Sequence, residues 1–318
     1  MKTYLLIFTG LFIAGICHAQ GEFSFKEHYD VSTPAKLILS SSDGNISVSP
    51  GNGNSIDVTY IVKKRNKVLN ISRKELEKEV TVNVTNTSNS LDISIKYPLN
   101  YNNFKDRYQV SFIVTVPKET ACELQSSDGN IAISGLTGDQ SFKTSDGNLD
   151  ISDITGKVNG KTSDGNIDTN DVNGAVEVRT SDGNITMKNI KGDVKAATSD
   201  GNIGLNKITG DVSVSTSDGE ISFNGLSGSF SASTSDGNVH GTIIALQKAL
   251  SVKTSDGSID ITIPDRLGLD LDVRGESLHV PLSNFSGTSE EKYIHGTVNG
   301  GGIAVNLSAD GNITLAYR

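Results

Sequence analysis

The hexapeptide Thr162-Ser-Asp-Gly-Asn-Ile167 recurs unchanged at residues 180–185 and 198–203, and this repetition decides the fold. The copies follow one another with a constant 18-residue period, and near copies extend the series in both directions. A fixed period of this kind is typical of repeat architectures, in which each repeat is one structural unit stacked on the next. The aspartates of the series are Asp128, Asp146, Asp164, Asp182, Asp200, Asp218 and Asp236, and Asp256 follows after a slightly longer interval.

Apolar residues take the same places in every repeat. Before the turn they alternate with polar residues, as Val176 and Val178 do ahead of Thr180. Alternation with period two predicts short strands with one buried face, and so short a repeat buries that face only by stacking on its neighbours. The predicted fold is therefore all-β, a parallel β-solenoid with 18-residue coils. The third residue after each aspartate is predicted to lie inside: Ile131, Leu149, Ile167, Ile185, Ile203, Ile221, Val239 and Ile259.

Two other architectures compete with this one. A β-propeller needs about 40–45 residues for each blade, more than the repeat supplies. Left-handed hexapeptide helices have coils of the same length, but the apolar positions here do not recur at every sixth residue, which favours a right-handed coil. Cys122 falls in an inward slot of the pattern and is expected to be a core residue.

The chain divides into a leader and three stretches of coil. Lys2, the apolar run Leu5–Ile16 and Cys17-His-Ala19 predict a signal peptide over residues 1–19, cleaved before Gln20. A lipoprotein acylated at Cys17 is the weaker alternative, because Ile16 stands where a small residue is expected. The remaining divisions are irregular N-terminal β coils with a cap, regular repeats, and irregular C-terminal coils continuous with the solenoid, at 20–125, 126–262 and 263–318.

The N-terminal stretch carries its own signals. Alternation predicts strands over residues 56–62, 80–84, 91–97 and 108–116. Ser72 and Glu75 form a capping-box pattern ahead of Leu76, which predicts a short helix. An open solenoid end exposes core and strand edges, so a capping helix near this end is expected.

Stacking the repeats lines up the aspartates from Asp128 to Asp256 along one edge. Neighbouring carboxylates about 4.8 Å apart in water repel by roughly 0.9 kcal/mol. Asx-turns, with the turn glycine (Gly183, for example) at positive φ, are expected to offset this repulsion. Calcium is the alternative, but one carboxylate per coil is few for such an ion and the known nine-residue calcium repeat is missing. We therefore predict a structural turn ladder and no metal or cofactor.

Three basic residues, Lys143, Lys161 and Arg179, stand at equivalent outward positions in successive coils. They are interpreted as counter-charges to the ladder, and a basic ligand-binding strip is the alternative. Catalytic signals are sparse: His240 occupies an outward position, and the histidines show no metal-ligand spacing. The net charge of -9, with 28 Lys and Arg against 37 Asp and Glu, argues against a nucleic-acid binder.

The iterated Thr-Ser-Asp-Gly-Asn-Ile coils, the early copy at 41–46, Val114-Thr-Val-Pro117 and Gly296-Thr-Val-Asn-Gly-Gly-Gly302 are similar to a known family. The sequence resembles the bacterial "putative adhesin" proteins with β-strand repeats, largely classed as domains of unknown function. The resemblance covers about residues 22–318. It implies a solenoid fold and an exported envelope protein, and it supplies no catalytic residues.

The function predicted from the sequence is that of an exported, non-enzymatic β-solenoid that binds at, or organises, the bacterial cell envelope or surface. Its partner would be an envelope or surface polymer, a glycan or a protein, and the mature chain has no transmembrane segment. The final compartment stays open among periplasm, outer membrane, cell surface and medium. A carbohydrate-active solenoid enzyme and a self-associating structural rod are the alternatives.

Overall fold

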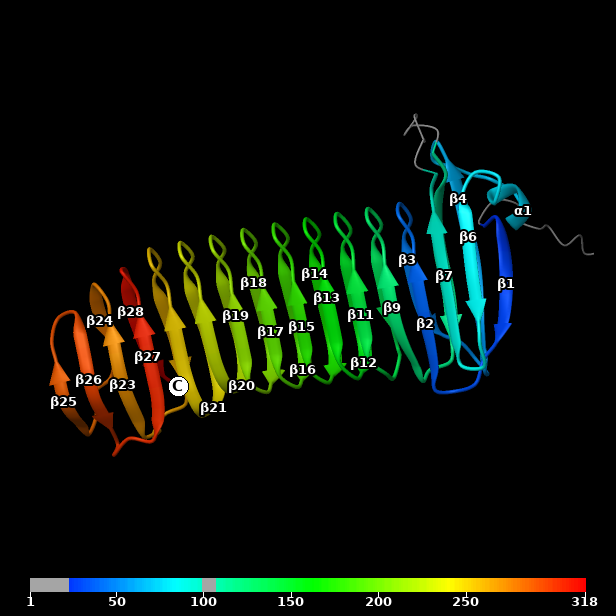
Figure 1. Cartoon of the computed structure of the whole chain (residues 1–318). Coiled ribbons are helices and arrows are strands. Elements are labelled where there is room, and N and C mark those ends of the chain that lie inside the picture. Colours follow the sequence, from blue (N-terminus) through cyan, green and yellow to red (C-terminus); the bar gives the residue numbers. More distant parts are fainter. Residues whose placement is uncertain (1–22, 99–106) are drawn as a thin grey trace, which may run out of the picture.

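The computed structural model describes residues 23–98 and 107–318, so the predicted signal peptide at 1–19 lies outside the described residues. The chain forms a long rod of stacked coils, with its one described α-helix, α1 (Arg73–Leu76), at the N-terminal end (Figure 1). The all-β, solenoid-like class predicted from the repeats is confirmed. The strands up to β9 are β1 (Phe25–Asp30), β2 (Ala35–Ser40), β3 (Ile46–Pro50), β4 (Ser55–Lys64), β5 (Lys67–Val68), β6 (Thr81–Asn86), β7 (Ser90–Lys96), β8 (Gln109–Val116) and β9 (Thr120–Gln125).

Each coil contributes two strands that pair in parallel with their equivalents in the next coil. We call the strand before the Ser-Asp-Gly-Asn turn part of the first sheet and the strand after it part of the second sheet. In the second sheet Leu149 pairs with Ile167 and Ile167 with Ile185, so each residue pairs with its equivalent one period later. The strands of the regular coils are β10 (Ile131–Ser134), β11 (Gln140–Lys143), β12 (Leu149–Thr155), β13 (Val158–Lys161), β14 (Ile167–Asn173), β15 (Val176–Arg179), β16 (Ile185–Lys191), β17 (Val194–Ala197), β18 (Ile203–Thr209), β19 (Val212–Ser215), β20 (Ile221–Ser233), β21 (Val239–Lys253) and β22 (Ile259–Ile263).

The core runs along the rod between the two sheets. Ile131, Ile185, Ile203 and Ile221 are at most 1% exposed and follow one another in register, as predicted. Cys122 is buried in the first sheet, and burial raises the pKa of its thiol to about 12. The thiol therefore stays protonated and behaves as a small apolar core group.

The prediction of positive φ for the glycine of the Ser-Asp-Gly-Asn turn is wrong. Gly183 is not among the residues with positive φ. Its constraint is stacking, because a Cβ there would lie 1.9 Å from the carbonyl oxygen of Gly165 in the coil before. Positive φ, between +137° and +157°, belongs to the glycines at the opposite edge of the coil: Gly138, Gly156, Gly174, Gly192, Gly210 and Gly228.

At the N-terminal end, the order of coils in space differs from their order in the sequence. The coil made by β2 and β3 lies between the coil of β7 and β8 and the coil of β9 and β10. In Figure 1 this places a blue coil between cyan and green ones. Strands β4, β6, β7 and β8 confirm the four predicted strands, with slightly shifted bounds. β1 and β4 then extend the second sheet in antiparallel fashion beyond β8.

The C-terminal end repeats this arrangement. The strands here are β23 (Leu269–Arg274), β24 (Ser277–His279), β25 (Phe285–Ser289), β26 (Tyr293–Val298), β27 (Ile303–Ser308) and β28 (Asn312–Tyr317). The last coil in the sequence, β27 and β28, is inserted between the coil of β21 and β22 and the strands β23 and β24. The chain therefore ends within the stack, and β26 and β25 form the tip in antiparallel pairing (Figure 1).

Candidate functional site

The turn edge of the rod is held by a buried row of threonine hydroxyls. Thr180 shows the pattern: its hydroxyl has one proton to donate, with the carbonyl oxygens of Ser163 (3.0 Å) and Gly165 (2.9 Å) in the preceding coil both within hydrogen-bond distance. The same hydroxyl oxygen accepts the backbone N–H of Gly183 at 3.3 Å. Each turn is thereby tied to itself and to the turn before it, and the buried backbone groups are satisfied.

Asparagines make a second row of bonds along this edge. The backbone N–H of Asn184 donates to the side-chain oxygen of Asn166 at 2.8 Å, and Asn202 donates to Asn184 in the same way. The backbone N–H groups of Ser181 and Asp182 both donate to the carbonyl of Ser163. The turn is thus satisfied by backbone, threonine and asparagine groups.

The aspartate side chains point into solvent. All eight, from Asp128 to Asp256, are exposed, and the backbone bonds of the turn keep them in register. The N–H that an Asx-turn at Asp182 would use is that of Asn184, and it donates instead to the side-chain oxygen of Asn166. Among the described residues, no group of three or more His, Cys, Asp or Glu side chains is placed to hold a metal ion. That the ladder serves structure alone stays a prediction.

The basic residues Lys143, Lys161 and Arg179 do lie side by side on the outside of the first sheet, each paired with the next in register. Arg179 forms an ion pair with Glu177 of its own strand at 3.2 Å. A carboxylate close by on the same strand therefore engages Arg179. The role of the strip as counter-charge to the aspartates stays a prediction.

The second sheet carries a depression that the sequence analysis did not single out. It has a volume of about 500 Å³ and lies over Gly204. At this outward position successive strands place Thr186, Gly204, Ser222 and His240 in register. The missing side chain of Gly204 leaves the backbone floor of the sheet open between polar neighbours. A glycine in an outward row of a repeat is the signal that could have revealed it.

Polar groups line this depression. The next outward row along the strands places Lys188, Asn206 and Asn224 next to one another. In the row of Gly204 itself, two coils farther along the rod, the imidazole Nδ1 of His240 contacts a carboxylate oxygen of Glu220 at 2.9 Å. Amides, hydroxyls, an ammonium and an imidazole–carboxylate pair thus surround a flat floor. Such a set donates and accepts hydrogen bonds in several directions.

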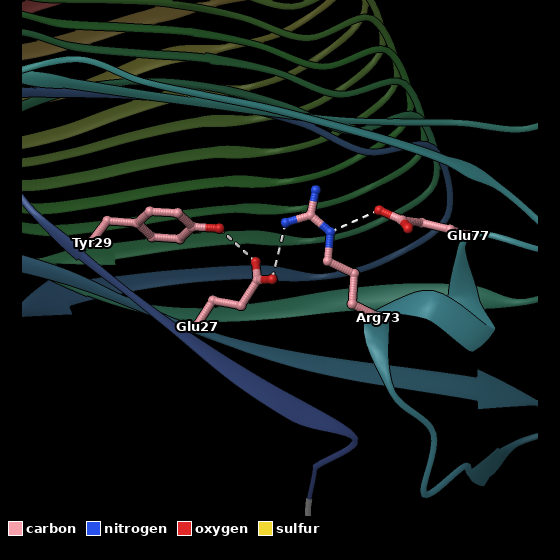
Figure 2. Close-up of polar contacts among 4 residues, drawn as sticks. All are labelled: Glu27, Tyr29, Arg73 and Glu77. Atoms are coloured by element: carbon pink, nitrogen blue, oxygen red, sulfur yellow. Dashed lines mark hydrogen bonds and ion pairs between the residues drawn. The ribbon is translucent and has the colours of Figure 1, made fainter.

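A second polar cluster lies at the N-terminal end and includes residues of both α1 and β1. Figure 2 shows Glu27 between Tyr29 and Arg73: the tyrosine hydroxyl donates to Glu27 at 2.6 Å, and the guanidinium of Arg73 does so at 3.0 Å. Arg73 also donates to Glu77 at 2.8 Å. Burial, and then the hydrogen bond to Glu27, raise the pKa of Tyr29 to about 12.

This cluster, Glu27, Tyr29, Arg73 and Glu77, connects the helix to strand β1. The predicted capping box is present, because the Glu75 carboxylate accepts from both the backbone N–H and the hydroxyl of Ser72. Leu76 is fully buried and anchors the helix to the core. The groups of the cluster bond to one another, as expected of a cluster that holds the capping helix against the end of the rod.

The stacked parallel strands and the polar outer residues of the second sheet together define an all-β repeat protein with a solenoid-like fold. The family model Toastrack, DUF4097, matches residues 35–223 and 208–316, and the chain belongs to this family. The resemblance drawn from the repeat motifs is confirmed. Comparison with curated proteins gives no significant match. No helix in residues 23–98 and 107–318 has the length and apolar character needed to cross a membrane.

Solved structures that this chain matches include three from Parabacteroides and Bacteroides species. A "putative adhesin" from Parabacteroides distasonis shares 16% identity over 76% of this chain and 98% of its own, with a TM-score of 0.46. A "putative lipid binding protein" from the same species shares 15% identity over 74% of this chain and 96% of its own, with a TM-score of 0.43. A "putative adhesin" from Bacteroides fragilis shares 18% identity over 74% and 96%, with a TM-score of 0.37.

Proposed function

We propose that the mature chain is an exported, non-enzymatic binding protein of the bacterial cell envelope or surface that holds an extended glycan across its second sheet. The observation that carries this proposal is the depression over Gly204, with its open floor and polar rim. A sugar ring has an apolar face and hydroxyl groups at its edge. A flat floor with hydrogen-bonding groups around it is complementary to that shape.

The repeat supports a polymer rather than a small ligand. Equivalent outward positions recur with each coil, about 4.8 Å apart along the rod. A polymer that presents the same groups at regular intervals can therefore meet similar side chains in several coils at once. Many weak contacts of this kind add up through effective concentration. The acidic net charge of -9 disfavours nucleic acid as that polymer.

Gly204 offers a sharp test because it can carry a side chain. A Cβ there would meet only the Ser222 hydroxyl, at 3.8 Å, and Gly204 does not have positive φ. Gly204→Gln should therefore fold normally and fill the depression. Ala132→Gln is the matched control, since Ala132 stands at the equivalent position on β10, several coils away along the rod.

The experiment is a screen of glycans and envelope polymers against the mature protein, with affinity measured by calorimetry for the best binder. We expect Gly204→Gln to weaken that binding about tenfold or more and Ala132→Gln to leave it unchanged. Equal binding by both variants would remove the depression from the proposal. Released sugar products, assayed in the same samples, would instead favour the enzyme alternative. The His240–Glu220 pair would then be the first candidate for the catalytic groups.

A further inference from the structure

We infer that two copies of this chain join tip to tip through strand β25, which pairs in antiparallel fashion with β25 of the second copy. In residues 23–98 and 107–318, β25 pairs with β26 and with no other strand. It forms the outermost strand of the C-terminal tip, at the opposite end of the rod from α1 (Figure 1). All of its residues except Phe285 are exposed.

The free edge of β25 presents a defined set of backbone groups. The backbone N–H of Asn299 donates to the carbonyl oxygen of Asn284 at 3.3 Å, and the N–H of Glu290 donates to the carbonyl oxygen of Tyr293 at 2.8 Å. These two bonds determine which residues of β25 bond to β26. Even-numbered residues from 284 to 290 thus exchange bonds with β26. The N–H and C=O groups of Phe285, Gly287 and Ser289 point the other way, toward the open edge.

One register satisfies all of these groups. With a two-fold axis through Gly287, each Gly287 bonds to its counterpart, and Phe285 pairs with Ser289 of the second copy. Every free donor and acceptor of the three residues is then used. A self-complementary contact of this type closes on itself and gives a dimer rather than a fibre.

The side chains permit this pairing. The Phe285 ring lies close over Gly287 and Gly296 and is partly buried against the core, so it leaves the edge clear. β25 contains no charged residue, whereas an exposed edge strand is ordinarily protected by charges or proline. Strand β1 at the other end carries Lys26, Glu27, His28 and Asp30. In the proposed register Glu290 faces Asn284 of the second copy, so the acidic residues beyond the strand do not oppose each other.

The test exploits positions 286 and 288, which face one another across the two-fold axis. Both residues are exposed, and neither is in the core. The double variant Ser286→Lys, Thr288→Lys places like charges opposite each other in the dimer, and so does Ser286→Glu, Thr288→Glu. Like charges directly across a strand pair are destabilising, and we expect each variant to raise the dissociation constant about tenfold or more.

Sedimentation over a concentration series measures the association, and small-angle scattering measures particle length. We expect wild-type protein to reach a dimer of about twice the monomer length, each double variant to stay monomeric at the same concentration, and an equimolar mixture of the two variants to form the dimer again. The control Ser231→Lys, Ser233→Lys, on the exposed middle of the first sheet, should associate as wild type does.

Restored pairing in the mixture also shows that the variants fold. A wild-type protein that stays monomeric up to its solubility limit would overturn the inference, and so would a lysine variant that dimerises normally or a mixture that does not pair. The assay needs no glycan, so its outcome is independent of the proposed function. A dimer joined this way would carry two copies of the second-sheet depression, with its N-terminal ends pointing apart.

Discussion

The middle coils and the two ends of the rod follow different rules. In the middle, each strand pairs with its equivalent one period later, and the order in space equals the order in the sequence. At each end one coil is inserted inward: β2 and β3 at one end, β27 and β28 at the other. The inserted coils carry copies of the turn motif, with Asp43 and Asp310, which is why those copies fall outside the series.

The difference shows what a periodic sequence can encode. A repeat specifies the neighbour one period away, and it cannot state that a distant segment will be inserted between two coils. The stretch from Asp256 to Asp310 is three periods long, yet between β22 and β27 it holds the two strands β23 and β24 and the hairpin β25–β26 rather than further regular coils. Insertion brings long-range pairing to each end, where a simple stack would stop at an open edge.

The turn glycines of the middle coils and Gly300 at the C-terminal end are required for different reasons, and this gives the largest expected effect. Gly183→Ala in the middle would bring a Cβ within 1.9 Å of the Gly165 carbonyl, in a stack held from both sides. We expect a loss of about 3 kcal/mol in the free energy of unfolding, the upper range for overpacking. A Cβ at Gly300, at the C-terminal end, would meet no atom within 4 Å, so the only strain in Gly300→Ala comes from the φ of +85°. We expect this variant to lose about 1 kcal/mol in the free energy of unfolding.

Urea melts followed by circular dichroism compare the two variants. Gly204→Ala is the control in the middle region, because it is neither crowded nor at positive φ, and it should melt as wild type does. Equal losses for Gly183→Ala and Gly300→Ala would mean that stacking does not distinguish the middle coils from the ends.

The second prediction concerns what holds the middle turns. Thr180→Val removes a buried hydroxyl that bonds to Ser163, Gly165 and Gly183, and should cost about 1–3 kcal/mol. Asp182→Ala removes only an exposed carboxylate and should change stability by less than about 0.5 kcal/mol. The same melts measure both. A larger loss for the aspartate would restore it as the structural element of the turn.

The row of threonines ends where the regular stack ends. In the inserted C-terminal coil, Ser308 pairs with Lys253, and Ala309 follows where Thr254 follows in the coil before. Ile313 then pairs with Ile259, so the turn is one residue shorter. This shorter turn lacks the hydroxyl that Thr254 supplies to the longer turn of the coil before.

The sequence predicted the middle of the rod well because each residue there pairs with its equivalent one period away. Inward positions such as Ile185 and the core place of Cys122 follow from alternation alone. The sequence did not single out the threonines that bond within the turn, since Asp and Thr stand two positions apart in one motif and propensity does not tell which side chain turns inward. The structural role of the aspartate ladder stays a prediction. The handedness of the coil and the divisions at 125 and 262 stay predictions.

The candidate site was harder to predict. Gly204 is one more glycine in a chain that has 33, and only its outward place in the second sheet gives it meaning. The free edge of β25 could not be foreseen either, because the repeat does not predict the β25–β26 hairpin that ends the first sheet. Both features depend on something that is missing, a side chain at Gly204 and a strand that pairs with the outer edge of β25, and a periodic pattern predicts only the contacts that are made.

The smallest expected effect is a pH dependence confined to the N-terminal end. His28 on β1 contacts Asp57 on β4 at 2.6 Å, and its hydrogen bond to Asp57, reinforced by Asp30, raises the pKa of the imidazole above its usual 6.5. A raised pKa in the folded state means that the bond stabilises fully below about pH 6.5 and is lost as the pH rises through the folded-state value. Hydrogen exchange, corrected for intrinsic rates, should therefore show less protection of β1 at about pH 8 than at about pH 6, with β16 unchanged. Asp57→Asn should bring the pKa of His28, followed by NMR, back toward its usual value and remove the pH effect on β1. An equal change in β16 would mean that the ends and the middle open together, as one cooperative unit.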